Sequence, residues 1–120
     1  MFINGLAIII IASLLLLAVT RLTVERVAHN HHAQKVSFFN RYPVQPGDIV
    51  FLGDSITDGA RWDELFPGLP VKNRGINANL TTNVLERLDN IVNWRPKAIF
   101  ILIGTNDLPW FERRRDEQIL

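Results

Sequence analysis

The chain has 120 residues, and its first twenty contain none of the 13 basic and 12 acidic residues. A net charge of +1 argues against a nucleic-acid partner, because it creates no positive field for a polyanion. The absence of cysteine excludes disulfides, thiolate metal ligands and a thiol nucleophile. The sequence therefore combines an uncharged N-terminal piece with a longer piece of ordinary soluble composition.

The segment from Phe2 to Thr20 predicts a membrane helix. Nineteen helical residues rise about 28 Å, which is close to the hydrocarbon thickness of a bilayer. The segment lacks the polar face of a soluble amphipathic helix, which argues against a buried core helix. A cleaved signal peptide is the stronger alternative, but no basic residue precedes the segment, and Ala18-Val19-Thr20 is a poor cleavage site. We predict that residues 1–20 form a single transmembrane anchor, or an uncleaved signal segment.

Residues 21–47 are expected to form a juxtamembrane linker. Four basic residues follow the apolar segment, and this distribution favours a cytoplasmic soluble part: Arg21, Arg26, Lys35 and Arg41. Three histidines, His29, His31 and His32, suggest a metal site, but neighbouring imidazoles on a polar stretch usually face water, and we expect that here. Pro46-Gly47 marks the start of the next unit.

Residues 48–120 alternate between apolar strands and helices. This order predicts an α/β unit with a parallel sheet and right-handed crossovers. The expected strands are Asp48–Leu52, Val71–Ile76 and Ala98–Ile103. A short helix with loops is expected over Ile56–Phe66. A second helix is expected to be capped by Thr81 or Thr82 and to end at Pro96, and a third to cover Trp110–Leu120.

A polar loop follows each predicted strand, and parallel strands bring such loops to one edge of a sheet. In the first loop, Ser55 follows a glycine turn and opens a helix, so it is either a nucleophile or an ordinary helix cap. In the third loop, Asn106 can donate its amide to a developing oxyanion, or can simply tolerate a left-handed turn. A phosphate or nucleotide site has weaker support, because the glycine loop lacks the lysine of a P-loop.

Three blocks in this order resemble the SGNH hydrolases, also called GDSL-type esterases and lipases. The blocks are Gly53-Asp54-Ser55-Ile56-Thr57, Asn73-Arg74-Gly75-Ile76 and Gly104-Thr105-Asn106-Asp107. The resemblance covers roughly residues 48–108 and is nearest to the branch of platelet-activating-factor acetylhydrolase-like and sialate O-acetylesterase-like proteins. It implies a flavodoxin-like three-layer α/β/α fold with strand order 2-1-3-4-5, of which this chain holds a truncated part.

The resemblance implies metal-independent hydrolysis of an ester, without a cofactor, on a lipid or an acylated sugar. Ser55 would be the nucleophile and Asp54 would support the first turn. The oxyanion hole would combine the Ser55 N–H, the Asn106 amide and an N–H from Gly75 or Ala78. Relatives with apolar N-terminal segments imply an extracytoplasmic domain, which opposes the charge argument.

Two departures from the family pattern stand out. Where the family usually has a glycine and then an aspartate in the second block, this chain has Ala78 and Asn79. The family's catalytic base is a histidine in a later Asp-x-x-His block, and that base histidine is absent from this chain. We therefore expect a membrane-anchored serine esterase represented by part of its domain. The alternatives are a non-catalytic membrane-tethered α/β binding module and a phosphate-binding flavodoxin-like domain.

Overall fold

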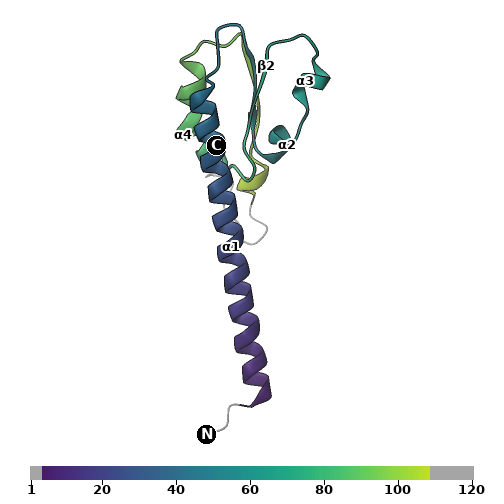
Figure 1. Ribbon diagram of the computed structural model, residues 1–120, viewed down its shortest axis with the longest axis vertical. Helices are drawn as coiled ribbons and strands as arrows, with labels where there is room; N and C mark the ends of the chain where they lie inside the picture. Colours follow the sequence, from purple (N-terminus) through teal and green to yellow (C-terminus); the bar gives the residue numbers. More distant parts are fainter. Residues whose placement is uncertain (1–3, 109–120) are drawn as a thin grey trace.

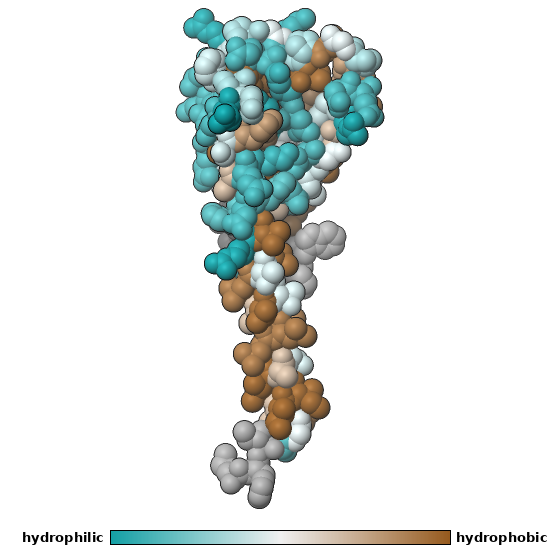
Figure 2. Space-filling view, in the orientation of Figure 1, coloured by the Kyte–Doolittle hydropathy of each residue, from teal (hydrophilic) through white to brown (hydrophobic). Residues whose placement is uncertain are grey.

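The computed structural model describes residues 4–108 of the chain (Figure 1). One long helix, α1 (Gly5–Arg41), leads into a small α/β unit. The molecule measures 72 × 32 × 24 Å, because the first half of α1 extends beyond that unit as an apolar stem (Figure 2). The predicted helix over Trp110–Leu120 lies outside the described residues.

The start of α1 is the apolar helix that the sequence predicts. Asn4 caps it by accepting a hydrogen bond from the Ala7 N–H at 2.9 Å. Among the described residues, α1 is the one helix long and apolar enough to cross a bilayer, and none of its most apolar stretch is buried within that part of the chain. Whether it does cross a membrane stays a prediction.

The sheet has three parallel strands, as the alternating pattern predicts, in the order β2-β1-β3 that the family resemblance implies. The strands are β1 (Ile49–Gly53), β2 (Val71–Gly75) and β3 (Ala98–Leu102). The central strand β1 pairs Ile49 with Val71 on one side and with Ala98 on the other, so all three strands begin at one level. Their carboxyl ends therefore share one edge of the sheet.

One face of the sheet forms the aliphatic core under helix α4 (Thr81–Val92). Alternate residues of β1, Val50 and Leu52, are fully buried there. From α4, Val84 and Ile91 meet them at helical spacing, while Leu85 and Val92 of the same helix are exposed. Val44, from the connection between α1 and β1, completes the cluster.

The opposite face is covered by aromatic rings and two short helices, α2 (Ser55–Asp58) and α3 (Trp62–Leu65). Phe51 of β1 stacks on the Trp62 ring at 3.8 Å between centroids, and on the Phe100 ring at 5.2 Å. The single short helix expected over Ile56–Phe66 is therefore divided in two, with the break beginning at Gly59.

The second half of α1 packs on the α/β unit. Residues 21–41, where we expected a linker, continue as helix without a break. Near the end of α1, the Phe39 ring lies 4.6 Å from the Arg74 guanidinium, and the Tyr42 carbonyl accepts a hydrogen bond from Arg74 at 2.6 Å. The predicted division of the chain into domains at residues 20 and 47 stays a prediction. The helix α1 is continuous from the stem to the α/β unit.

A pair of substitutions on α4 tests this core. Ile91 is 3% exposed and Leu85 is 62% exposed on the same helix. We expect Ile91→Ala to lower the free energy of unfolding by about 2–4 kcal/mol, because it leaves a cavity beneath the sheet. Leu85→Ala should change it by less than about 0.5 kcal/mol. Guanidinium titration of the detergent-solubilised chain measures both, and equal losses would contradict this packing.

Candidate active site

Three loops meet at the carboxyl edge of the sheet. The register places Gly53, the last residue of β1, opposite Gly75 of β2 and Leu102 of β3. Each strand then enters a loop that carries predicted site residues: Ser55 after β1, Ala78 after β2 and Asn106 after β3. The structure therefore brings these residues to the same edge, which we call the site edge. The helix α2 and the short 3-10 helix η1 (Thr105–Asp107) lie there together (Figure 1).

The first loop is a tight turn held by Asp54. This aspartate is almost fully buried, and its Oδ1 accepts a hydrogen bond from the Ile56 N–H at 3.0 Å. Ser55 is the first residue of α2 and is exposed to solvent. A Cβ atom on Gly53 would overlap the Leu102 carbonyl and the Thr57 hydroxyl, so only glycine lets β1, β3 and α2 approach this closely.

In the second loop, the two candidate donors of the oxyanion hole, Gly75 and Ala78, have different surroundings. The Gly75 N–H donates to the Asn73 side-chain oxygen at 2.9 Å, and Gly75 is buried against the backbone of Asp58. Ala78 is exposed and has a φ of +61°, in the left-handed region that favours glycine. The position where the family usually has glycine thus keeps a glycine-like conformation with alanine in it.

The third loop is tied to the second by two side chains. The Asn106 amide Nδ2 donates to the Asn79 carbonyl at 3.0 Å. The Asp107 carboxylate accepts from the Thr81 N–H at 3.0 Å and from the Thr81 hydroxyl at 2.6 Å. The prediction that a threonine caps α4 is wrong, because Leu80 occupies the N-cap position and the acceptor for the Thr81 N–H comes from Asp107 in another loop.

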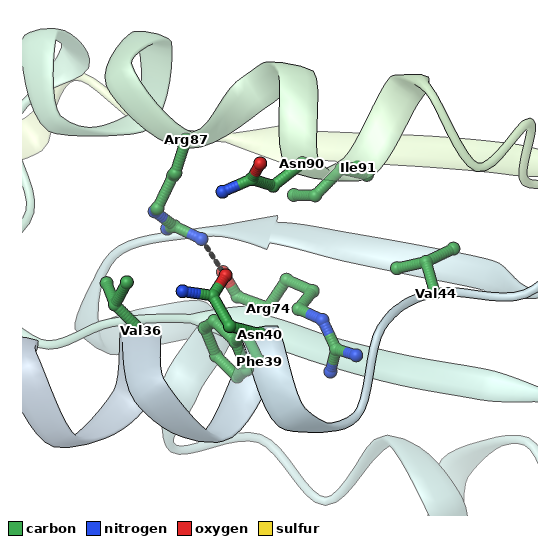
Figure 3. A pocket seen from close by; sticks show the side chains of 8 residues that line it. All are labelled: Val36, Phe39, Asn40, Val44, Arg74, Arg87, Asn90 and Ile91. Atoms are coloured by element: carbon green, nitrogen blue, oxygen red, sulfur yellow. Dashed lines mark hydrogen bonds between the residues drawn. The ribbon is translucent and has the colours of Figure 1, made fainter.

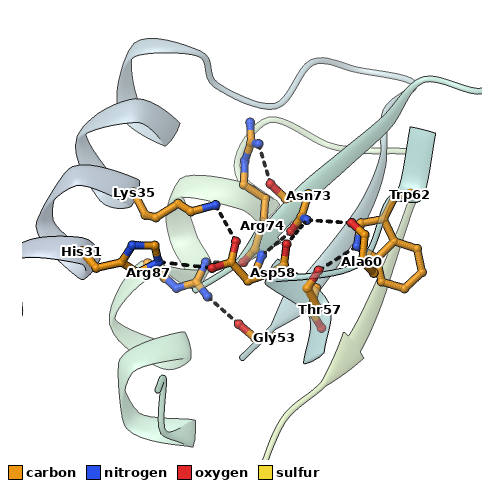
Figure 4. A network of polar contacts seen from close by, with 11 residues as sticks. His31, Lys35, Gly53, Thr57, Asp58, Ala60, Trp62, Asn73, Arg74 and Arg87 are labelled. Carbon is orange, nitrogen blue, oxygen red and sulfur yellow. Dashed lines mark hydrogen bonds and ion pairs between the residues drawn. The ribbon is translucent and has the colours of Figure 1, made fainter. Parts of the chain in front are cut away.

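Arg87 of α4 links the strand ends at this edge by hydrogen bonds, and no pattern in the sequence predicted this role. The side chain is buried, and its guanidinium donates to the Gly53 carbonyl at 3.2 Å (Figure 4), the Arg74 carbonyl at 2.8 Å and the Asn79 side-chain oxygen at 3.1 Å. Burial, and then the neighbouring Arg74 charge, lower the pKa of Arg87 to about 10, so it stays charged at neutral pH. Its position on α4 between the apolar residues Val84 and Ile91 was the feature of the sequence that could have indicated its burial.

Asp58, at the end of α2, binds two side chains of α1 (Figure 4). His31 Nε2 lies 3.2 Å from one carboxylate oxygen, and Lys35 Nζ lies 2.5 Å from the other. Burial by itself would raise the pKa of Asp58, but the hydrogen bonds from Lys35 and His31 outweigh it and hold the pKa below its usual range.

The expectation that the linker histidines face water is wrong for two of the three. His31 binds Asp58, and the His32 Nε2 atom is buried. Burial, followed by the nearby Arg87 charge, lowers the pKa of His32. The error arose because the packing of α1 on the α/β unit cannot be read from a polar stretch.

A small enclosed hollow lies away from the strand ends (Figure 3). It has a volume of about 20 Å³ and sits between α1 and α4, with Phe39 on one side and Ile91 on the other. That volume holds about one water molecule. It is therefore a packing gap beneath α1, and none of the predicted site residues lines it.

Residues 51–119 match the GDSL-like Lipase/Acylhydrolase family. Over 66 residues the chain is 39% identical to platelet-activating factor acetylhydrolase IB subunit alpha2 of Homo sapiens, and 38% identical to subunit alpha1 of Rattus norvegicus. These matches cover 50% of this chain and 29% and 28% of the two relatives.

A solved structure agrees with these matches. It is described as that of a platelet activating factor from Streptococcus pneumonia, and it superposes with a TM-score of 0.64 at 31% identity. The superposition covers 76% of this chain and 45% of the solved chain. The fold and these likenesses define an α/β protein related to the ester hydrolases. The chain belongs to the GDSL-like lipase/acylhydrolase family, and it spans less than a third of the length of the curated relatives it matches.

Removing the Arg87 guanidinium should destabilise the site edge. We expect Arg87→Met to lower the free energy of unfolding by about 2–4 kcal/mol, because three acceptors each lose a hydrogen bond from the buried guanidinium. Arg61→Met is the matched control, since the Arg61 side chain is 69% exposed and its ion pairs lie in water. Denaturant titration measures both variants, and similar losses would contradict the role given to Arg87.

The left-handed conformation of Ala78 predicts a gain from glycine. Ala78→Gly should raise the free energy of unfolding by up to about 1 kcal/mol, because it removes the steric penalty of a Cβ atom at positive φ. Ala60→Gly, at a position without positive φ, should lower it instead. Thermal unfolding of the two variants provides the measurement, and a loss of stability in both would refute the conformation of Ala78.

Proposed function

We propose that this chain is part of a membrane-anchored serine ester hydrolase that removes an acyl or acetyl group from its substrate. Family membership supports hydrolysis of an ester. The observation that carries the proposal is the bond from Asn106 to the Asn79 carbonyl, at the edge where Ser55 opens α2. It joins the second and third loops at the same edge of the sheet as the proposed nucleophile.

In this proposal Ser55 attacks the ester carbonyl, and the developing oxyanion is bound by three donors. One is the backbone N–H of Ser55 at the start of α2. Another is the Asn106 amide, whose nitrogen carries two hydrogens, so that the bond to Asn79 leaves the second for the oxyanion. Such a side-chain donor stabilises a transition state by roughly 3–4 kcal/mol.

Ala78 is our candidate for the remaining donor. The Gly75 N–H already donates to Asn73, and Gly75 is buried against the backbone of Asp58. Ala78 is exposed at the same edge, two residues after the buried Ile76. Its left-handed conformation is one that glycine favours, and glycine is the usual residue of the family at this position.

The general base is expected to be the histidine of the family's later Asp-x-x-His block. His31 does not replace it in this geometry. Its imidazole binds Asp58, and no hydrogen bond joins it to Ser55 within residues 4–108. The proposal also includes the flavodoxin-like three-layer fold, which the order β2-β1-β3 supports, and a membrane span formed by the start of α1.

Replacement of the nucleophile tests this function. The full-length gene product should hydrolyse p-nitrophenyl acetate, and Ser55→Ala should reduce kcat by at least about a thousandfold, because no hydroxyl remains to form the acyl-enzyme. Thr105→Ala, in the neighbouring loop at the same edge, is the control and should retain most activity. Equal rates for the Ser55→Ala variant and the natural protein would favour a non-catalytic binding module.

A further inference from the structure

The direction of α1 decides which way the site edge faces. After Arg41 the chain turns through residues 42–48 and returns as β1, and Figure 1 shows the strands running opposite to α1. The carboxyl ends of the strands therefore point back toward the N-terminal stem. Figure 1 shows α2 and η1 on the side of the α/β unit from which the stem extends.

Contacts along α1 hold this orientation. Close to the site edge, His31 and Lys35 bind Asp58, three residues after Ser55. Two to three turns further along, Phe39 packs on Arg74, and the Tyr42 carbonyl binds the same guanidinium. Since these contacts span more than two turns of one unbroken helix, the α/β unit cannot swing freely on the stem.

The helix also sets the height of the site. From Thr20, the end of the uncharged segment, to His31 is eleven residues, or about 17 Å at 1.5 Å per residue. The headgroup layer of a bilayer extends roughly 5–8 Å beyond the hydrocarbon on each side. The site edge thus faces the membrane from a level about 10 Å above the headgroups of ordinary phospholipids.

We propose that the substrate of this site is an ester carried on a large polar head of a membrane-anchored amphiphile, such as an acylated sugar on a lipid anchor. This inference rests on the proposed hydrolase function. A site that faces the bilayer at this height meets such a head without extracting its lipid. An ester at the glycerol level would have to rise about 17 Å, and each CH₂ group pulled from the hydrocarbon costs about 0.8 kcal/mol.

The reaction on this substrate follows the ordinary course of ester hydrolysis. Ser55 takes the acyl group while the head hydroxyl, with the proton returned to it, stays on the membrane. Water then releases the acyl group as a carboxylic acid and restores the serine hydroxyl. The acid leaves toward solvent, and the deacylated amphiphile diffuses away in the bilayer.

The orientation is tested first, without any need for activity. The chain has no cysteine, so Asn77→Cys at the site edge and Lys97→Cys at the opposite edge each provide one labelling position. Both residues are exposed. In phosphatidylcholine vesicles that contain a headgroup-attached nitroxide lipid, a bimane label at position 77 should be quenched at least twice as strongly as one at position 97. Equal quenching, or stronger quenching at position 97, would overturn the inference.

The substrate class is tested with the full-length gene product in vesicles. One substrate is a glycosyl diacylglycerol acetylated on its sugar, and the other is soluble p-nitrophenyl acetate. An insertion of 18 helical residues between Arg26 and Val27 adds five full turns, which raises the site by about 27 Å without turning it. Hydrolysis of the glycolipid ester should fall at least tenfold, while hydrolysis of the soluble ester should stay within twofold.

The outcomes separate this inference from the function on which it rests. Unchanged rates on both esters after the insertion would refute the membrane-held substrate and leave the hydrolase function intact. Hydrolysis of neither ester above the rate of Ser55→Ala would refute the hydrolase function, and the inference with it. Faster hydrolysis of phospholipid acyl esters than of the sugar acetate would refute the substrate class.

Discussion

The site edge depends on one buried charge. The Arg87 guanidinium reaches from α4 to the carbonyls at the ends of β1 and β2 and to the Asn79 side chain. A buried cation without such acceptors would be strongly unfavourable, so the helix and the two strand ends hold one another in register. Asn79 then extends the arrangement, since its carbonyl accepts the hydrogen bond from Asn106 of the third loop.

The second constraint is the long helix α1, which is both stem and part of the α/β unit. Its apolar half meets the composition of a membrane span, while its other half supplies His31, Lys35 and Phe39 to contacts with the unit. A flexible linker would leave the direction of the site unspecified. A continuous helix that is bound at several points gives the site one direction and one height relative to the stem.

The edge of β3 stands apart from the rest of the packing. Phe100, Ile101 and Leu102 are each more than half exposed, although the residues of the central strand β1 alternate between buried and partly buried. An apolar edge strand of this kind offers unpaired backbone groups to a further strand. This agrees with a chain that spans less than half of the solved relative it superposes on.

The sequence by itself determined the strands, the main helix of the α/β unit and the family. Apolar runs predicted the three strands, helical spacing predicted α4, and three short blocks identified the family, because each of these signals is local in the chain. Only the tertiary structure decided that Asp107 caps α4, that Arg87 ties two strand ends together and that His31 binds Asp58. These contacts join residues 26 to 34 positions apart, and such pairings depend on how the elements pack against one another, which no local pattern specifies.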